Sequence, residues 1–91
     1  MRNVHNSVAD TIEDLNQQGI YFQEVTIFQD EQNDKRYIIR VRQPHLPNSR
    51  MEIEVIEDDG VPIASVLDRY RISRATMDVF MDRLMVMLDD D

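Results

Sequence analysis

The segment RYIIRVRQPHLPNSRMEIEVI, residues 36–56, contains two runs of alternating side chains separated by a loop. Apolar residues occupy every second position of each run: Tyr37, Ile39 and Val41 in the first, Met51, Ile53 and Val55 in the second. A period of two is typical of β-strands with one buried face. Pro44 and Pro47 lack backbone donors, so the residues between the runs cannot continue a central strand. The segment therefore predicts strands over residues 36–42 and 50–56.

The flanking residues predict one further strand and three helices. Residues 20–28 are rich in β-branched and aromatic side chains, which suit a pleated sheet. The helical spacing of apolar residues predicts helices over residues 6–18, 62–70 and 74–88, and Pro62 favours the start of the middle helix. We expect one α+β domain over residues 1–91, in the order α-β-β-β-α-α, in which helices pack on a three-stranded antiparallel sheet.

The composition indicates an intracellular globular domain. The chain has 91 residues, of which 42% are hydrophobic and 31% charged, as in proteins with one packed core. It has no cysteine, which excludes a disulfide framework and thiolate metal sites. No apolar run approaches the roughly 18 residues of a membrane span, and the first residues do not resemble a signal peptide. We expect a cytoplasmic location.

Charge is distributed unevenly along the chain. The formal net charge is −8, from 18 acidic and 10 basic residues. Residues 35–50 hold 5 of the basic residues and no acid, so the rest of the chain carries 18 acidic against 5 basic groups, or −13. Such a balance concerns partners and solubility rather than fold. It argues against general nucleic-acid binding and for a protein that meets a basic surface.

The acidic residues form two clusters, one at the third strand and the turn after it, the other on the last helix and in the tail, residues 89–91. Carboxylates on a rigid scaffold can mimic phosphates and compete for arginines and lysines that grip a nucleic-acid backbone. We therefore predict an acidic inhibitor or adaptor, a DNA mimic, whose partner is a nucleic-acid-processing protein with a basic surface. The predicted binding residues are Glu52, Glu54, Glu57, Asp58, Asp59, Asp78, Asp82 and Asp89. The alternative is that these acids are only solvated and keep a small protein soluble.

The charged residues of the predicted sheet have two interpretations of their own. If the apolar positions face the core, Arg40 and Glu52 face away from it and can pair across the strands. Each such pair contributes about 0.2–1 kcal/mol to stability. The alternative is a docking surface on this outer face, which would include Phe22, Phe28 and Ile38.

The last two predicted helices allow a different class of function, a DNA-binding regulator. Residues 66–77 and the apolar positions after them resemble the helix-turn-helix of bacterial repressors. Such a protein would bind DNA through Arg69, Arg71, Arg74 and Thr76. The motif is degenerate, and Asp78 and Asp82 on the presumed recognition helix would face the phosphates.

A third class is a homodimeric structural or assembly protein. Val79, Val86 and Met87 lie off the main apolar stripe of the last helix, where they could form a contact between two copies.

Catalytic and metal-binding motifs do not rise above background. His5 and His45 are too few and too isolated for a metal site, and no serine has an evident histidine partner. Two glycines, Gly19 and Gly60, cannot form a phosphate-binding or dinucleotide-binding loop. We predict no enzyme activity, no metal and no cofactor.

With its length, its acidity and the run YIIRV at residues 37–41, the chain resembles acidic anti-CRISPR proteins of type II-A systems, which are small phage-encoded inhibitors. One such group shares the predicted element order and has a similar run in its second strand. The resemblance implies blockade of the DNA-binding site of a nuclease, with acidic side chains in a basic pocket meant for DNA. Residues 35–50 depart from a pure DNA mimic. Their arginines could grip an acidic patch on the partner or pair internally with Glu52 and Glu54.

Overall fold

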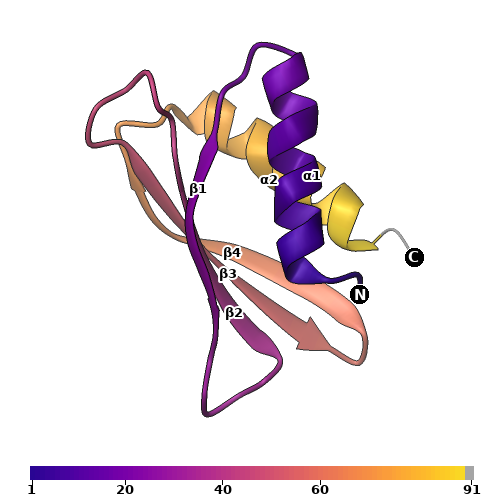
Figure 1. Cartoon of the computed structure of the whole chain (residues 1–91). Helices are drawn as coiled ribbons and strands as arrows, with labels where there is room; N and C mark the ends of the chain where they lie inside the picture. Colours follow the sequence, from indigo (N-terminus) through magenta and orange to yellow (C-terminus); the bar gives the residue numbers. More distant parts are fainter. Residues whose placement is uncertain (90–91) are drawn as a thin grey trace.

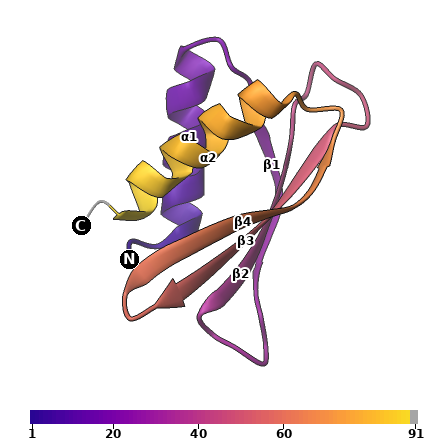
Figure 2. The same ribbon diagram turned by 180° about the vertical axis from the view of Figure 1, so that it is seen from behind.

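The computed structural model describes residues 1–89 and has one sheet covered by helices on a single face (Figures 1 and 2). Its elements are α1 (Val4–Gln17), β1 (Gln23–Gln29), β2 (Arg36–Arg42), β3 (Arg50–Asp58), β4 (Val61–Tyr70) and α2 (Arg74–Asp89). The strands form an antiparallel meander in the order β1-β2-β3-β4. The chain is thus an α+β protein with a single compact domain in the described residues.

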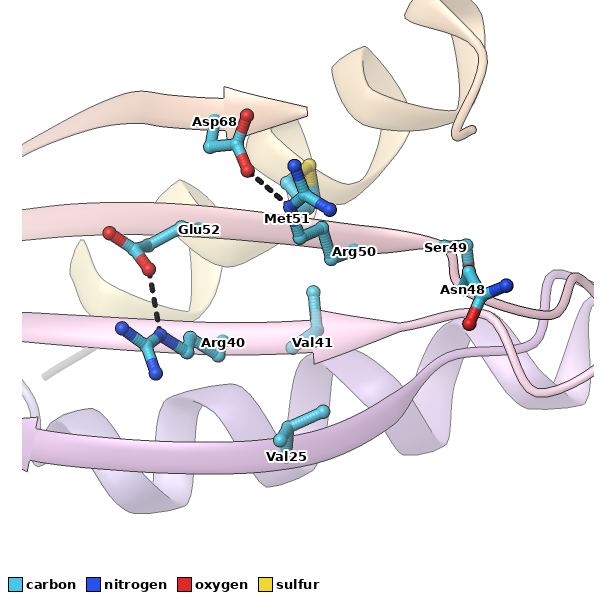
Figure 3. Close-up of a pocket in the computed structure, with 9 residues that line it drawn as sticks. All are labelled: Val25, Arg40, Val41, Asn48, Ser49, Arg50, Met51, Glu52 and Asp68. Carbon is cyan, nitrogen blue, oxygen red and sulfur yellow. Dashed lines mark hydrogen bonds and ion pairs between the residues drawn. The ribbon is translucent and has the colours of Figure 1, made fainter. Parts of the chain in front are cut away.

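The alternating residues of the two central strands meet in register. Ile39 lies opposite Ile53 and Val41 opposite Met51, and all four side chains are fully buried on the face that the helices cover. Arg40 and Glu52 lie opposite each other on the uncovered face, which we call the outer face (Figure 3). The strands predicted over residues 36–42 and 50–56 are confirmed as β2 and β3, and the strand predicted over 20–28 is present as β1.

The helix predicted over residues 62–70 is wrong, and so are the three-stranded sheet and the order α-β-β-β-α-α. Val61–Tyr70 is the edge strand β4, which pairs antiparallel with β3. A β-bulge explains the misleading pattern, because Leu67 has no Cα partner between Val66 and Asp68 and the alternation slips there by one residue. Pro62 is the second residue of β4, and an edge strand tolerates its missing donor.

A two-residue turn joins β3 to β4. Asp58 pairs with Val61, and the residues between them, Asp59 and Gly60, have φ angles of 52° and 76°. Positive φ at both central positions defines the type I′ hairpin turn, for which Asp-Gly is a preferred sequence. This turn reverses the chain so that Val61–Tyr70 pairs with β3. These residues are therefore a strand and not a helix.

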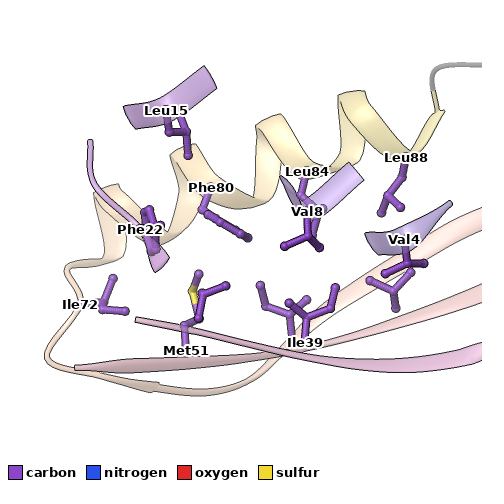
Figure 4. Close-up of a cluster of buried hydrophobic side chains, with 13 residues drawn as sticks. Val4, Val8, Leu15, Phe22, Ile39, Met51, Ile72, Phe80, Leu84 and Leu88 are labelled. Carbon is purple, nitrogen blue, oxygen red and sulfur yellow. The ribbon is translucent and has the colours of Figure 1, made fainter. Parts of the chain in front are cut away.

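The core lies between the sheet and the two helices (Figure 4). The rings of Phe22 and Phe80 pack with their centroids 4.7 Å apart, and Leu84 and Leu88 continue the same face of α2. Two buried hydroxyls of α1 are satisfied within the helix: Thr11 donates to the Ser7 carbonyl at 2.7 Å, and Ser7 to the Asn3 carbonyl at 2.8 Å. The helices predicted over residues 6–18 and 74–88 are present as α1 and α2.

Candidate protein-binding surface

The outer face of the sheet carries arginine–carboxylate pairs that join neighbouring strands (Figure 3). Arg40 on β2 donates from Nε to Glu52 on β3 at 2.7 Å. Arg50 on β3 donates from Nε to Asp68 on β4 at 2.6 Å, and this bond raises the pKa of the Arg50 guanidinium. Each pair crosses from one strand to the next, so it stabilises the sheet as well as neutralising charge.

Arg36 joins β2 to both β3 and the loop after β1. It donates from Nε to Glu54 at 2.7 Å and from Nη1 to Asp30 at 2.9 Å, and these two bonds raise the pKa of its guanidinium. The backbone N–H of Gln32 also donates to Asp30, and this bond together with that from Arg36 lowers the pKa of the Asp30 carboxyl. The predicted cross-strand Arg–Glu pairs are therefore present. Glu52 and Glu54, two of the predicted partner-binding residues, contact arginines of their own sheet.

A hollow of about 500 Å³ lies on the outer face between Val25, Asn48 and the ion pairs of Arg40 and Arg50 (Figure 3). Its single hydroxyl, on Ser49, accepts from the backbone N–H of Gln43 and donates to the carbonyl of the same residue. These two hydrogen bonds between Ser49 and Gln43 link the two ends of the loop between β2 and β3. The hollow therefore offers charged hydrogen-bonding groups but no activated nucleophile.

The apolar residues predicted for a docking surface on the outer face are divided between two places. Phe28 and Ile38 lie opposite each other there, Phe28 44% exposed and Ile38 only 4%. Phe22 precedes β1 and is buried in the core, because the chain turns toward the helices before the strand begins. The outer face therefore combines arginine–carboxylate pairs with exposed apolar side chains, such as Phe28 and Ile63.

The other predicted binding residues lie at the β3–β4 turn and on α2. Asp58 and Asp59 are exposed in the turn, and Asp78, Asp82 and Asp89 are exposed on α2. Within residues 1–89, none of these five aspartates forms a salt bridge. Their charge is therefore not neutralised by a described arginine or lysine.

Two backbone hydrogen bonds bring the turn and the end of α2 together. The Met1 nitrogen donates to the Gly60 carbonyl at 3.0 Å, and the Arg2 N–H donates to the Leu88 carbonyl at 3.0 Å. The turn and the end of α2 thus lie at one end of the molecule (Figures 1 and 2). We call this the acidic end, formed by Glu57, Asp58, Asp59 and Asp89. Asp90 and Asp91, also predicted to belong to the acidic tail, lie outside the described residues.

The helix-turn-helix is not formed, because its first helix is the strand β4. The residues predicted for DNA binding lie at the end of the molecule opposite the acidic end, and most are engaged locally. Arg69 donates from Nη1 to the Ile72 carbonyl at 2.7 Å, and the Arg71 guanidinium lies 5.3 Å from the centre of the Tyr70 ring. The Thr76 N–H donates to the Ser73 hydroxyl at 3.1 Å, so Ser73 caps α2 and Thr76 belongs to its first turn.

Arg74 differs from these residues. It is exposed in the first turn of α2 and makes no side-chain hydrogen bond within residues 1–89.

Of the residues predicted for a homodimer contact, Val79 and Val86 lie on one face of α2, and Met87 lies beside residues of α1. Val79 and Val86 are 39% and 57% exposed, and Met87 is half-buried. The two valines border a shallow hollow of about 250 Å³ with Asp82 and Arg83.

A larger hollow lies between α1 and the start of β1 and was not foreseen from the sequence. It has a volume of about 660 Å³, and its lining consists of three apolar residues, Ala9, Ile12 and Phe22, and five polar or charged ones, Glu13, Asn16, Gln17, Gln23 and Glu24. The sequence signal was the acid at position 24 in a strand rich in β-branched and aromatic residues, but that residue alone does not reveal a groove.

No family model matches the chain, and no curated protein or solved structure matches it either. The resemblance to type II-A anti-CRISPR proteins therefore depends on acidity, length and the run at residues 37–41. The element order that supported it is not the order found in the structure.

The remaining features of residues 1–89 concern metal binding, one aromatic contact and membrane spanning. Within residues 1–89, no group of three or more histidine, cysteine, aspartate or glutamate side chains is arranged to hold a metal ion. His45 packs edge-on against Tyr21, with ring centroids 6.4 Å apart. No helix of the described chain has both the length and the apolar character needed to cross a membrane.

Proposed function

We propose that this protein is a non-enzymatic inhibitor or adaptor that binds a basic, nucleic-acid-binding surface of a partner protein. One observation carries the proposal: the exposed aspartates of the acidic end and α2 form no salt bridge within residues 1–89, whereas Glu52, Glu54 and Asp68 on the outer face of the sheet are paired with arginines. The unpaired aspartates therefore carry negative charge that a partner can reach.

The positions of these aspartates favour recognition of a basic surface. Asp78 and Asp82 lie one turn apart on α2, and Asp58 and Asp89 are fixed at the acidic end by the backbone contacts of Met1 and Arg2. Carboxylates on rigid elements lose little conformational freedom when they bind, so they can replace phosphates in a basic site at a small entropic cost. Interactions of this kind weaken as salt increases.

The proposal is tested by affinity capture from a nuclease-treated lysate of the source cells, read by mass spectrometry. We expect one DNA- or RNA-processing protein in stoichiometric amount at low salt and its loss at high salt. Recovery of the CRISPR nuclease would support the narrower anti-CRISPR proposal, and recovery of another nucleic-acid enzyme would support a different target.

Charge-reversal variants identify the surface responsible. Asp58→Lys with Asp89→Lys changes the acidic end, and Asp78→Lys with Asp82→Lys changes α2. The matched control is Glu31→Lys with Asp34→Lys in the loop between β1 and β2, which alters the net charge equally. Loss of the partner with the first two variants and not with the control supports the proposal. Equal retention by all three contradicts it.

A second candidate function is a homodimeric assembly protein, favoured by the exposed Val79 and Val86 on α2. In this case the chain would sediment as a dimer, and Val86→Asp would convert it to a monomer. A wild-type chain that remains monomeric at high concentration contradicts this candidate.

A further inference from the structure

We propose that the groove between α1 and β1 binds a short extended segment of the partner, with an apolar side chain on the groove floor and basic side chains at Glu13 and Glu24. The inference rests on the proposed function, because it gives the basic partner a specific contact on this chain. The groove has a volume of about 660 Å³, and α1 forms one wall while residues 22–24 form the other.

The floor of the groove is apolar and preformed. Ile12 is half-buried and packs against the core, and Phe22 is 3% exposed. Ala9 is exposed on the same wall and presents only a methyl group, which leaves room for an incoming side chain. The walls are fixed to each other, because the Phe22 N–H donates to Oδ1 of Asn16 on α1 at 3.1 Å. An apolar side chain can therefore enter without a rearrangement of the helix and strand.

The border of the groove is acidic on both walls. Glu24 lies opposite Val41, whose side chain faces the core, so Glu24 is on the helix side of the sheet and yet exposed. Glu13 is exposed on α1. Within residues 1–89, neither glutamate forms a salt bridge. Two carboxylates beside an apolar floor favour arginine or lysine flanking an apolar residue.

The backbone of β1 favours an extended occupant. β1 is an edge of the sheet, so alternate N–H and C=O groups point away from β2 and have no partner strand. A segment added to such an edge gains main-chain hydrogen bonds and places alternate side chains on the same face. The bulge between Glu24 and Thr26 interrupts the edge, so the segment that pairs here is short.

The charges of this chain argue against a second copy as the occupant. The net charge is −8, so two copies of the chain repel each other overall. A segment from a basic partner does not meet this repulsion. We therefore assign the groove to the partner.

The test uses the full chain labelled with ¹⁵N and the capped peptide Arg-Thr-Leu-Thr-Arg. In an extended peptide the leucine and both arginines share one face, which matches the apolar floor and its acidic border. We expect chemical-shift changes confined to residues 9–17 and 22–24. The peptide with glutamate in place of arginine, and the peptide with serine in place of leucine, should each bind at least about tenfold more weakly.

Protein variants separate the groove from general charge attraction. Glu13→Lys with Glu24→Lys should weaken binding of the arginine peptide by about tenfold or more, since each lysine repels the ligand. Glu31→Lys with Asp34→Lys changes the net charge equally and should leave binding unchanged. Ala9→Trp fills the floor from an exposed helix position and should also abolish binding. Circular dichroism of each variant verifies that the fold is retained.

Three results would overturn the inference: no binding of the arginine peptide, shifts located outside the groove, or equal weakening by the Glu31 and Asp34 control. Glu24 would then serve only to keep the β1 edge from pairing. These results are independent of the proposed function, which is tested by lysate capture with the Asp58, Asp89, Asp78 and Asp82 variants. If the Glu13 and Glu24 variant still captures the partner and the four aspartate variants do not, the proposed function stands and the groove inference is wrong.

Discussion

Arg40 on β2 and Glu52 on β3 face each other directly across the strand pair, joined by a 2.7 Å hydrogen bond from the arginine Nε. The Arg40 side chain is 53% exposed, so water and salt reach the pair. Because Glu52 already has a cation beside it, its negative charge is partly neutralised and attracts a basic partner less strongly. The acids that lack such a neighbour, at the acidic end and on α2, are therefore better placed for binding.

The first prediction concerns the strength of this pair. A double-mutant cycle with Arg40→Ala and Glu52→Ala should give a coupling free energy of about 0.2–1 kcal/mol, as is usual for exposed cross-strand ion pairs. The coupling should decrease when salt is added. Urea unfolding of the four proteins at low and high salt measures it. A coupling above about 2 kcal/mol would mean that the pair is shielded from solvent, contrary to its exposure.

The second prediction concerns pH. Hydrogen bonds from Gln32 and Arg36 lower the pKa of Asp30 below its usual value of 3.8, so near that pH the unfolded chain binds more protons at this site than the folded chain. Its contribution to stability is complete above the unfolded pKa and is lost as the pH falls through the lower folded pKa. Asp30→Asn should therefore lower the melting temperature at neutral pH, and the difference from wild type should shrink between about pH 5 and pH 1.

Thermal melts monitored by circular dichroism across this pH range measure the effect. Asparagine keeps an oxygen that can accept from the Gln32 N–H, so the substitution removes mainly the charge. A difference in melting temperature that stays constant down to the lowest pH contradicts the assignment. The matched control is Asp34→Asn in the same loop, whose side chain forms no salt bridge within residues 1–89.

The third prediction concerns the β3–β4 turn. Gly60 has φ of 76°, and a Cβ added there would meet no atom within 4 Å, so substitution strains only the backbone. Gly60→Ala should lower the free energy of unfolding by about 1–2 kcal/mol. Gly60→Asn should cost less, because asparagine tolerates positive φ better than alanine. Chemical denaturation measures both, and an equal loss for the two variants would contradict a purely conformational origin.

The central part of the fold could be predicted from the sequence because one face of each strand is buried. In β2 and β3 apolar residues occupy every second position, and the burial of Ile39 and Ile53 follows that pattern directly. The two helices were also predicted, since their apolar faces have the helical period over several turns. Local pattern and tertiary burial agree in all of these elements.

β4 was mistaken for a helix because two local features imitate one. The bulge at Leu67 gives the apolar residues the spacing i, i+3 and i+4, and Pro62 stands where a helix often begins. The Asp59-Gly60 pair was the stronger signal, since it specifies a two-residue hairpin.

The acidic residues posed a different problem. Pairing of Glu52 with Arg40 could be expected from strand register, but the groove between α1 and β1 depends on how a helix packs on a sheet edge.

The fourth prediction distinguishes a strand from a helix at β4 in solution. Ser65 is exposed on the outer face, opposite Glu54, so a substitution there changes little packing. In a strand, threonine is favoured over alanine by up to about 1 kcal/mol, whereas in a helix alanine is favoured over threonine. Ser65→Thr should therefore raise the free energy of unfolding and Ser65→Ala should lower it, as measured by urea denaturation of both variants. The opposite order would indicate that residues 61–70 are helical, and the hairpin, the bulge and the outer face built on them would then be wrong.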